Sequence, residues 1–124
     1  MSILYEKGNQ TFHLTNGMIS YIMKVLPNNQ LGQLYFGKAV QHRESFDHLL
    51  ELGYRSMSSC VFEGDLRFSM EHIKQEYPSY GTGDYRHPAV GILQENGSHI
   101  TNFVYESHRI TKGKPGLEGL PATY

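Results

Sequence analysis

The chain has 124 residues, of which 39% are hydrophobic, and its 11 lysine and arginine residues nearly balance its 12 aspartate and glutamate residues. It contains no apolar run near the roughly 20 residues that a membrane span needs, so the sequence predicts at most one soluble domain, with no membrane partner. The formal charge of −1 leaves no basic surplus for a phosphate backbone, which argues against nucleic acid as a partner.

An antiparallel meander is predicted for the first 40 residues. Apolar and polar side chains alternate over residues 12–25, and the pair Asn16-Gly17 within this stretch is typical of a type I′ hairpin turn. A Pro-Asn-Asn break follows. Residues 31–40 are again β-prone, and Gly32 and Gly37 within them indicate a bulge or a close backbone approach. We therefore expect three antiparallel strands.

Two short helices are predicted in the middle of the chain. Ser45 can cap the first, whose apolar side chains recur at spacings of three and four residues before a glycine at position 53. Ser69 can cap the second, which Pro78 ends because proline disfavours helical backbone before it. Residues 60–62, between the two, are compatible with a brief strand.

The second half of the chain is predicted to be irregular and to contain one hairpin. Residues 77–91 combine glycine, proline and tyrosine, which indicates an ordered loop because bulky aromatic rings need a surface to pack on. A second Asn-Gly pair, at 96–97, predicts a hairpin over residues 90–105. Residues 112–120 are typical of a connector, and the β-prone ending behind them indicates a chain that is cut short. The predicted fold is all-β and mainly antiparallel, with one or two short helices.

The titratable residues form no recognisable catalytic or metal-binding pattern. None of the seven histidines has a histidine partner three or four residues away, so no metal is predicted. The single cysteine, Cys60, lacks the surroundings of a nucleophile and cannot form an internal disulfide. Because the chain also starts without a secretory signal, we expect a reducing, cytoplasmic location. Spacing alone does not pair Asp65, Glu76 and Asp84 as the acid and nucleophile of a glycosidase.

Tyrosine, arginine and aspartate gather on glycine-rich stretches. They occur at Tyr54-Arg55, in residues 65–67 and in residues 80–86, and they combine aromatic faces with planar charged groups. This chemistry suits the recognition of a sugar, and it suits a polar interface between domains equally well. Composition leaves both interpretations open.

Five strings then occur in order along the chain: LGQLYFGKAV at 31–40, FEGDLRF at 62–68, QEYPSYGTGDYR at 75–86, LQENGS at 93–98 and HRITKGKPGLEGLPATY at 108–124. Together they resemble the N-terminal segment of bacterial α-galactosidases of glycoside hydrolase family thirty-six, over essentially the whole chain. The resemblance implies that residues 1–124 are part of a large N-terminal β-sandwich. The catalytic (β/α)₈ barrel and the C-terminal β-domain would lie outside them, and residues 77–86 would order the junction with the barrel.

The resemblance also implies an activity for the whole enzyme: cytoplasmic, retaining hydrolysis of terminal α-galactosides such as melibiose and raffinose, with no metal or other cofactor. Both catalytic aspartates of the family lie on the barrel, so no catalytic residue carries over to this chain. By itself the chain is expected to be structural, oligomerising and inactive. A free-standing carbohydrate-binding or assembly module is the alternative, and a small complete enzyme using Cys60 or histidines is a third possibility.

Family members of this kind form tetramers, and the resemblance implies that a loop of the N-terminal domain reaches a neighbouring subunit's active site. Residues 54–67 are the candidate stretch. The predicted substrate-binding residues are Tyr54, Arg55, Asp65 and Arg67, with the partners being the rest of the parent chain, further copies of it and, in the full enzyme, α-galactoside sugars.

Overall fold

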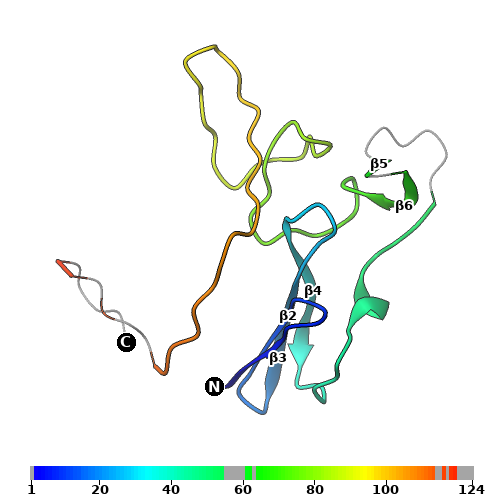
Figure 1. Cartoon of the computed structure of the whole chain (residues 1–124), viewed down its shortest axis with the longest axis vertical. Helices are drawn as coiled ribbons and strands as arrows, with labels where there is room; N and C mark the ends of the chain where they lie inside the picture. The colour runs from blue at the N-terminus through cyan, green and yellow to red at the C-terminus, as the bar shows by residue number, and fades with distance from the viewer. Residues whose placement is uncertain (1, 55–60, 63, 114–115, 117, 120–124) are drawn as a thin grey trace.

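The computed structural model describes residues 2–54, 61–62, 64–113, 116 and 118–119. Its main body is a four-stranded antiparallel sheet of β1 (Ser2–Glu6), β2 (Thr11–Thr15), β3 (Ile19–Val25) and β4 (Leu31–Lys38), paired in chain order (Figure 1). A short second sheet pairs β5 (Val61–Phe62) with β6 (Asp65–Ser69), and a 3₁₀ turn, η1 (Asp47–Leu49), precedes it. The antiparallel β class predicted from the sequence is confirmed, as is the brief strand before residue 63.

The meander has one strand more than predicted. β1 pairs along its whole length with β2, from Ser2 opposite Thr15 to Glu6 opposite Thr11. The turn between β2 and β3 is present, but it is not type I′, because that turn needs positive φ at both central residues. Only Gly17 has it, at 86°. Oδ1 of Asn16 instead accepts hydrogen bonds from the backbone amides of Met18 and Ile19, at 2.9 Å each.

The strand β4 makes the close approach that its glycines predict. A Cβ added to Gly32 would lie 2.7 Å from the side chain of Leu26, so no larger residue fits without movement. The strand also carries a bulge, because Ile22 of β3 pairs with Tyr35 and the next residue, Met23, pairs with Gln33, which leaves Leu34 of β4 as the extra residue. Residues 74–76 run along the free edge of β4, with backbone hydrogen bonds of 3.0 and 2.8 Å. They join the sheet edge to the second half of the chain.

Neither predicted α-helix forms. The first is reduced to η1, and the hydroxyl of Ser45 accepts a hydrogen bond from the amide of Asp47 at 3.1 Å without starting a helix. The second prediction is wrong because Ser69 ends β6 and the chain then turns. Met70 and Ile73, whose spacing suggested one face of a helix, flank this turn. Their side chains enter a core that also contains Leu26 and Phe68. Within the described part of the chain, no helix has the length and apolar character that crossing a membrane requires.

Residues 77–105 form an irregular excursion that extends away from the sheet (Figure 1). Backbone hydrogen bonds tie it to itself, from the amide of Thr101 to the carbonyl of Tyr80 and from Ala89 to Pro78, both 2.9 Å. The predicted ordered loop is therefore confirmed. The predicted second hairpin has its turn, closed by a 2.9 Å bond between positions 94 and 98, but it has no strands.

The main sheet has two different faces. One row of apolar side chains crosses all four strands on the first face: Ile3, Leu14, Tyr21 and Phe36. The corresponding row on the second face is Leu4, His13, Ile22 and Tyr35. The second face buries Ile22 completely, whereas Phe36 on the first face is 67% exposed. Around Phe36 the first face thus presents apolar surface that the described residues leave open, whereas Phe12 and Val25 on the same face are buried.

Candidate functional site

The stretch predicted to contact sugar starts and ends at one place. The amide of Gly53 donates to the carbonyl of Arg67 at 3.0 Å, so the backbone just before this stretch lies beside β6. Tyr54, the first residue beyond this bond, is 65% exposed. Arg55 and Cys60 lie outside the described residues. The structure therefore brings two of the four predicted residues, Tyr54 and Arg67, onto neighbouring segments of backbone.

The other described residue of the set, Asp65, is paired with Arg67. Guanidinium nitrogens Nε and Nη2 of Arg67 donate to the two carboxylate oxygens at 3.1 and 3.2 Å, and the amide of Arg67 donates to the same carboxylate at 3.0 Å. These hydrogen bonds hold the pKa of Asp65 below its usual value and raise the pKa of Arg67. Asp65 is thus an ionised acceptor, and the pair offers a planar, polar and exposed edge.

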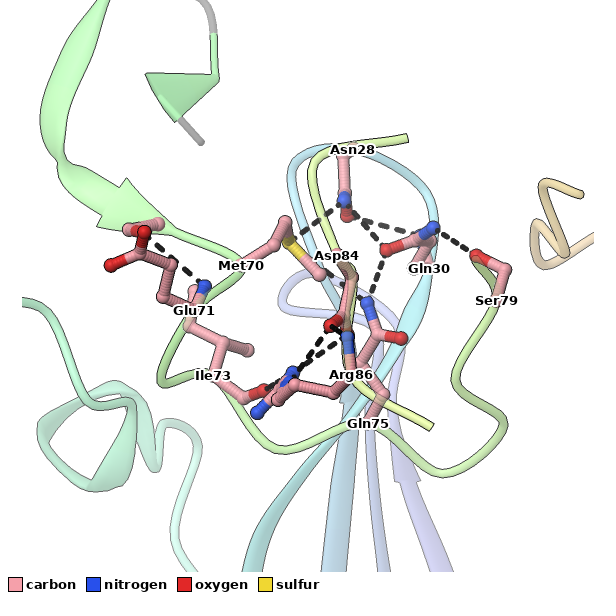
Figure 2. Close-up of polar contacts among 10 residues, drawn as sticks. Asn28, Gln30, Met70, Glu71, Ile73, Gln75, Ser79, Asp84 and Arg86 are labelled. Carbon is pink, nitrogen blue, oxygen red and sulfur yellow. Dashed lines mark hydrogen bonds and ion pairs between the residues drawn. The ribbon is translucent and has the colours of Figure 1, made fainter. Parts of the chain in front are cut away.

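Asp84 and Arg86 make the same kind of pair in a buried setting (Figure 2). Nε and Nη2 of Arg86 donate to the carboxylate oxygens at 2.8 and 2.7 Å, and Nη2 also donates to the carbonyl of Ile73 at 2.8 Å. The carboxylate residue is only 2% exposed. Burial alone would raise the pKa of Asp84, but the hydrogen bonds and charge of Arg86 outweigh it and lower that pKa. The pair fixes the excursion to the turn that follows β6.

The buried amide of Gln30 is the second polar anchor (Figure 2). Its nitrogen donates to Ser79 Oγ and to Asn102 Oδ1, both at 3.1 Å. Its oxygen accepts from Asn28 Nδ2 at 2.9 Å and from Gln75 Nε2. One side chain in the β3–β4 turn therefore fastens three later segments, and its hydrogen-bonding capacity is fully used.

None of the three carboxylates considered from the sequence is arranged as an acid or a nucleophile. Asp65 and Asp84 are each held by an arginine, and Glu76 accepts a hydrogen bond from the hydroxyl of Tyr21. Among the described residues, no group of three or more His, Cys, Asp or Glu side chains could hold a metal ion. The excursion also carries a cavity of about 290 Å³, lined by Tyr80, Pro88, Gly91 and His99.

The sequence contains a signal for both arginine pairs that composition alone does not reveal. Asp-x-Arg occurs twice, at 65–67 and at 84–86, and in both places the arginine amide and guanidinium bind the aspartate two residues earlier. The pattern predicts the pairing but not its burial. Gln30 has no such signal, because three of its four partners, all except Asn28, lie 45 to 72 residues away in the chain.

Comparison with known proteins places the chain in a large and consistent group. Residues 29–124 match the family profile described as the glycosyl hydrolase family 36 N-terminal domain. The chain is 42% identical over 124 residues to the α-galactosidase AgaA of Geobacillus stearothermophilus. A crystal structure of an α-galactosidase from Lactobacillus brevis superposes on 97% of this chain with a TM-score of 0.87 and 34% identity.

A variant of Geobacillus AgaA solved in complex with raffinose superposes on 92% of the chain, with a TM-score of 0.75 and 43% identity. The chain spans only a small part of each of these proteins. It covers 17% of the length of AgaA and 16% of the chain of each of the two solved structures.

Proposed function

The chain belongs to the glycosyl hydrolase family 36 N-terminal domain family, and from this premise we propose that it is the first part of the N-terminal β-domain of an α-galactosidase. Its role is to scaffold and assemble the enzyme, and the chemistry lies in a (β/α)₈ barrel elsewhere in the parent protein. The observation that carries this proposal is coverage, because the relatives match the whole chain while it accounts for 17% of AgaA. The three carboxylates held by structural partners agree with it.

The open sheet face supports a partner for this domain. Phe36, at 67% exposure, and Met18, at 75%, lie at the same end of the sheet, where a second layer of strands would cover them. We propose that later parts of the parent chain complete a β-sandwich here and that the whole enzyme assembles into tetramers. The chain by itself should then self-associate, and sedimentation showing only a monomer across a wide concentration range would contradict this.

The proposed substrate class is terminal α-galactosides such as melibiose and raffinose, cleaved with retention of configuration in the parent enzyme. Geobacillus AgaA, whose variant was solved with raffinose, is the relative that supports it. The single cysteine, Cys60, is consistent with a cytoplasmic enzyme, which is part of the same proposal.

We assign the outer edge of a neighbouring subunit's sugar pocket to Tyr54, Arg55, Asp65 and Arg67. Exposure of the Tyr54 ring and the planar Asp65–Arg67 pair support stacking and hydrogen bonding to a sugar. The test replaces the aligned segment of Geobacillus AgaA by this chain. In that chimera, Arg67→Lys should raise KM for raffinose by about 3- to 10-fold, the value of one or two hydrogen bonds, with little change in kcat.

The matched control is Leu66→Ala, because Leu66 is 52% exposed and lies on the same strand, pointing to the opposite face. It should leave KM unchanged. Equal effects of the two substitutions, or none from Arg67→Lys, would contradict the edge assignment.

Hydrolysis of an aryl α-galactoside by the isolated chain tests its inactivity directly. The expected rate of hydrolysis equals that of a control without protein. Turnover that disappears in Asp65→Asn or Glu76→Gln would place the active site within this chain and overturn the proposal.

Calorimetric titration with melibiose tests the alternative, a free-standing carbohydrate-binding module. Such a module would bind the sugar by itself, whereas an edge-forming loop would scarcely bind it without its barrel.

A further inference from the structure

Residues 39–46, which we call the strap, connect β4 to η1 and lie over the second face of the sheet. Two backbone amides hold the start of the strap. The amide of Ala39 donates to the carbonyl of Met18 at 2.8 Å, and the amide of Val40 donates to Ser20 Oγ at 3.0 Å. Near its end, Asn9 Nδ2 donates to the carbonyl of residue 44 at 2.7 Å, and Phe46 is 3% exposed. The strap is therefore attached at both ends and covers the middle of β2 and β3.

Two histidines face each other beneath the strap. His13, 1% exposed on β2, places Nδ1 at 3.1 Å from Nδ1 of His42 in the strap, and its Nε2 lies 2.8 Å from Ser20 Oγ. Nε2 of His42 lies 2.9 Å from a carboxylate oxygen of Glu6 on β1. The two rings are stacked with centroids 5.3 Å apart, and the ring of Phe46 stands edge-on to His13. Four residues from four segments thus form one continuous chain of contacts.

Hydrogen bonding fixes where the protons lie in this chain at neutral pH. An ionised Glu6 only accepts, so His42 donates from Nε2 and is left with an accepting Nδ1. His13 must then donate from its Nδ1 and accept at Nε2 from the hydroxyl of Ser20, which itself accepts from the Val40 amide. Every donor meets an acceptor, and both imidazoles are neutral.

A first added proton can be accommodated without breaking the chain. With both nitrogens of His42 protonated, its Nδ1 donates to Nδ1 of His13, and the proton of His13 moves to Nε2 and points to Ser20. The cation remains next to Glu6. A second added proton cannot be accommodated in this way. It would place a hydrogen on each of the two facing Nδ1 atoms, which are 3.1 Å apart. Both stacked rings would then be cations, and one of them, His13, is buried.

We propose that the His13–His42 pair is a proton-operated latch for the strap, closed when the pair carries no or one extra proton and opened by the second. Opening releases Phe46 and the chain that leads through η1 to residue 54. This inference does not depend on the activity of the parent enzyme.

The groups around the pair are consistent with opening at low pH. Glu6 is the acidic group that contacts it, Ser20 contributes a neutral hydroxyl, and Phe46 separates the pair from His48, whose ring centroid lies 6.4 Å beyond that of Phe46. Burial and then the charge of His42 lower the pKa of His13. A histidine with a lowered pKa stabilises the closed form above its ordinary value of about 6.5, and the contribution is lost as the pH falls below it.

Imidazole ¹⁵N NMR of this chain tests the closed state without any substitution. Above pH 7 the expected proton positions are Nδ1 on His13 and Nε2 on His42, and the reverse pair of tautomers would overturn the proposal. As the pH falls, the pair should take up its two protons in two separate steps.

Hydrogen exchange tests the opening. After correction for the intrinsic pH dependence, exchange of the Val40 amide should accelerate by about tenfold per pH unit through the second step, because opening takes up one proton. Amides in the β2–β3 ladder should stay protected. His42→Gln, which cannot become a cation, should remove the acceleration, whereas the control His87→Gln, in the exposed part of the excursion, should retain it. A strap that stays closed to pH 5, or an acceleration that persists in His42→Gln, would contradict the latch.

Discussion

Replacing Arg86 by methionine should leave a buried carboxylate, that of Asp84, without its cation. Methionine keeps an unbranched apolar side chain but removes the guanidinium that binds Asp84 and the carbonyl of Ile73. The carboxylate would then be 2% exposed with no cation beside it. Removing one partner of a fully buried pair costs about 3–5 kcal/mol. Because the arginine side chain is 42% exposed and water can partly replace it, we expect about 2–3 kcal/mol here.

The dependence of this loss on pH provides a sharper test than its size. In the native chain Arg86 lowers the pKa of Asp84, so the stabilisation is present at neutral pH and is lost as the pH falls through that lowered value. In Arg86→Met, burial without the cation should raise the same pKa above its usual value. The variant's carboxyl then becomes neutral at a higher pH, which relieves the defect.

Urea unfolding of the native chain and of Arg86→Met at pH 7, 6, 5 and 4 measures both effects. The difference in unfolding free energy should shrink as the pH falls. The double variant Asp84→Asn/Arg86→Met, which has no buried charge, should be more stable at pH 7 than Arg86→Met by about 1 kcal/mol or more. A difference that is constant with pH, or a double variant no more stable than the single one, would refute the proposed balance between burial and pairing.

Three further substitutions test the anchors of the fold by urea unfolding. Gln30→Met should cost about 2–4 kcal/mol, because it removes the hydrogen bonds that the Gln30 side chain makes with the buried Ser79 and with its amide partners. Gln41→Met, at an exposed position, should cost less than about 0.5 kcal/mol. Gly32→Ala should cost about 1–3 kcal/mol because its Cβ would meet Leu26 at 2.7 Å; no measurable loss would mean that Leu26 moves freely. Gly81→Ala, at a φ of 92° and 2.7 Å from Ile100, should cost about 1–3 kcal/mol and spare the β2–β3 ladder in hydrogen exchange; uniform loss of protection would contradict a local effect.

The β2–β3 hairpin could be predicted because strand alternation is a local property of the sequence. Residues 12–25 alternate on a period of two around a glycine with positive φ, and both features are retained in the structure. The type of turn could not be predicted, since the Asn16 side chain competes with its own backbone for the turn amides. The first strand was missed because five residues before a Lys-Gly pair carry too short a pattern to stand out.

Helix prediction failed where burial imitates helical spacing. Met70 and Ile73 are three residues apart and both buried, which is the pattern of a helix face. Here the core of Leu26 and Phe68 sets their positions from outside the segment, and the chain between them turns. Tertiary packing of this kind cannot be read from a window of ten residues.

The candidate site was predictable as a set of residue types but not as a geometry. Asp65 and Arg67 were identified from composition and resemblance, and the structure adds that they bind each other and that Gly53 closes the stretch against β6. The histidine pair could not be predicted from the sequence. His13 and His42 are 29 residues apart, so only the path of the strap brings them together.

We propose that this chain supplies scaffold to an α-galactosidase and no bond-breaking groups. The most direct test of this proposal is the α-galactosidase activity of three proteins: Geobacillus AgaA with the aligned segment deleted, the same enzyme with this chain in its place, and this chain alone. We expect that the deletion abolishes activity, that the replacement restores it and that the chain alone gives none. Full activity after the deletion, or turnover by the isolated chain, would contradict it.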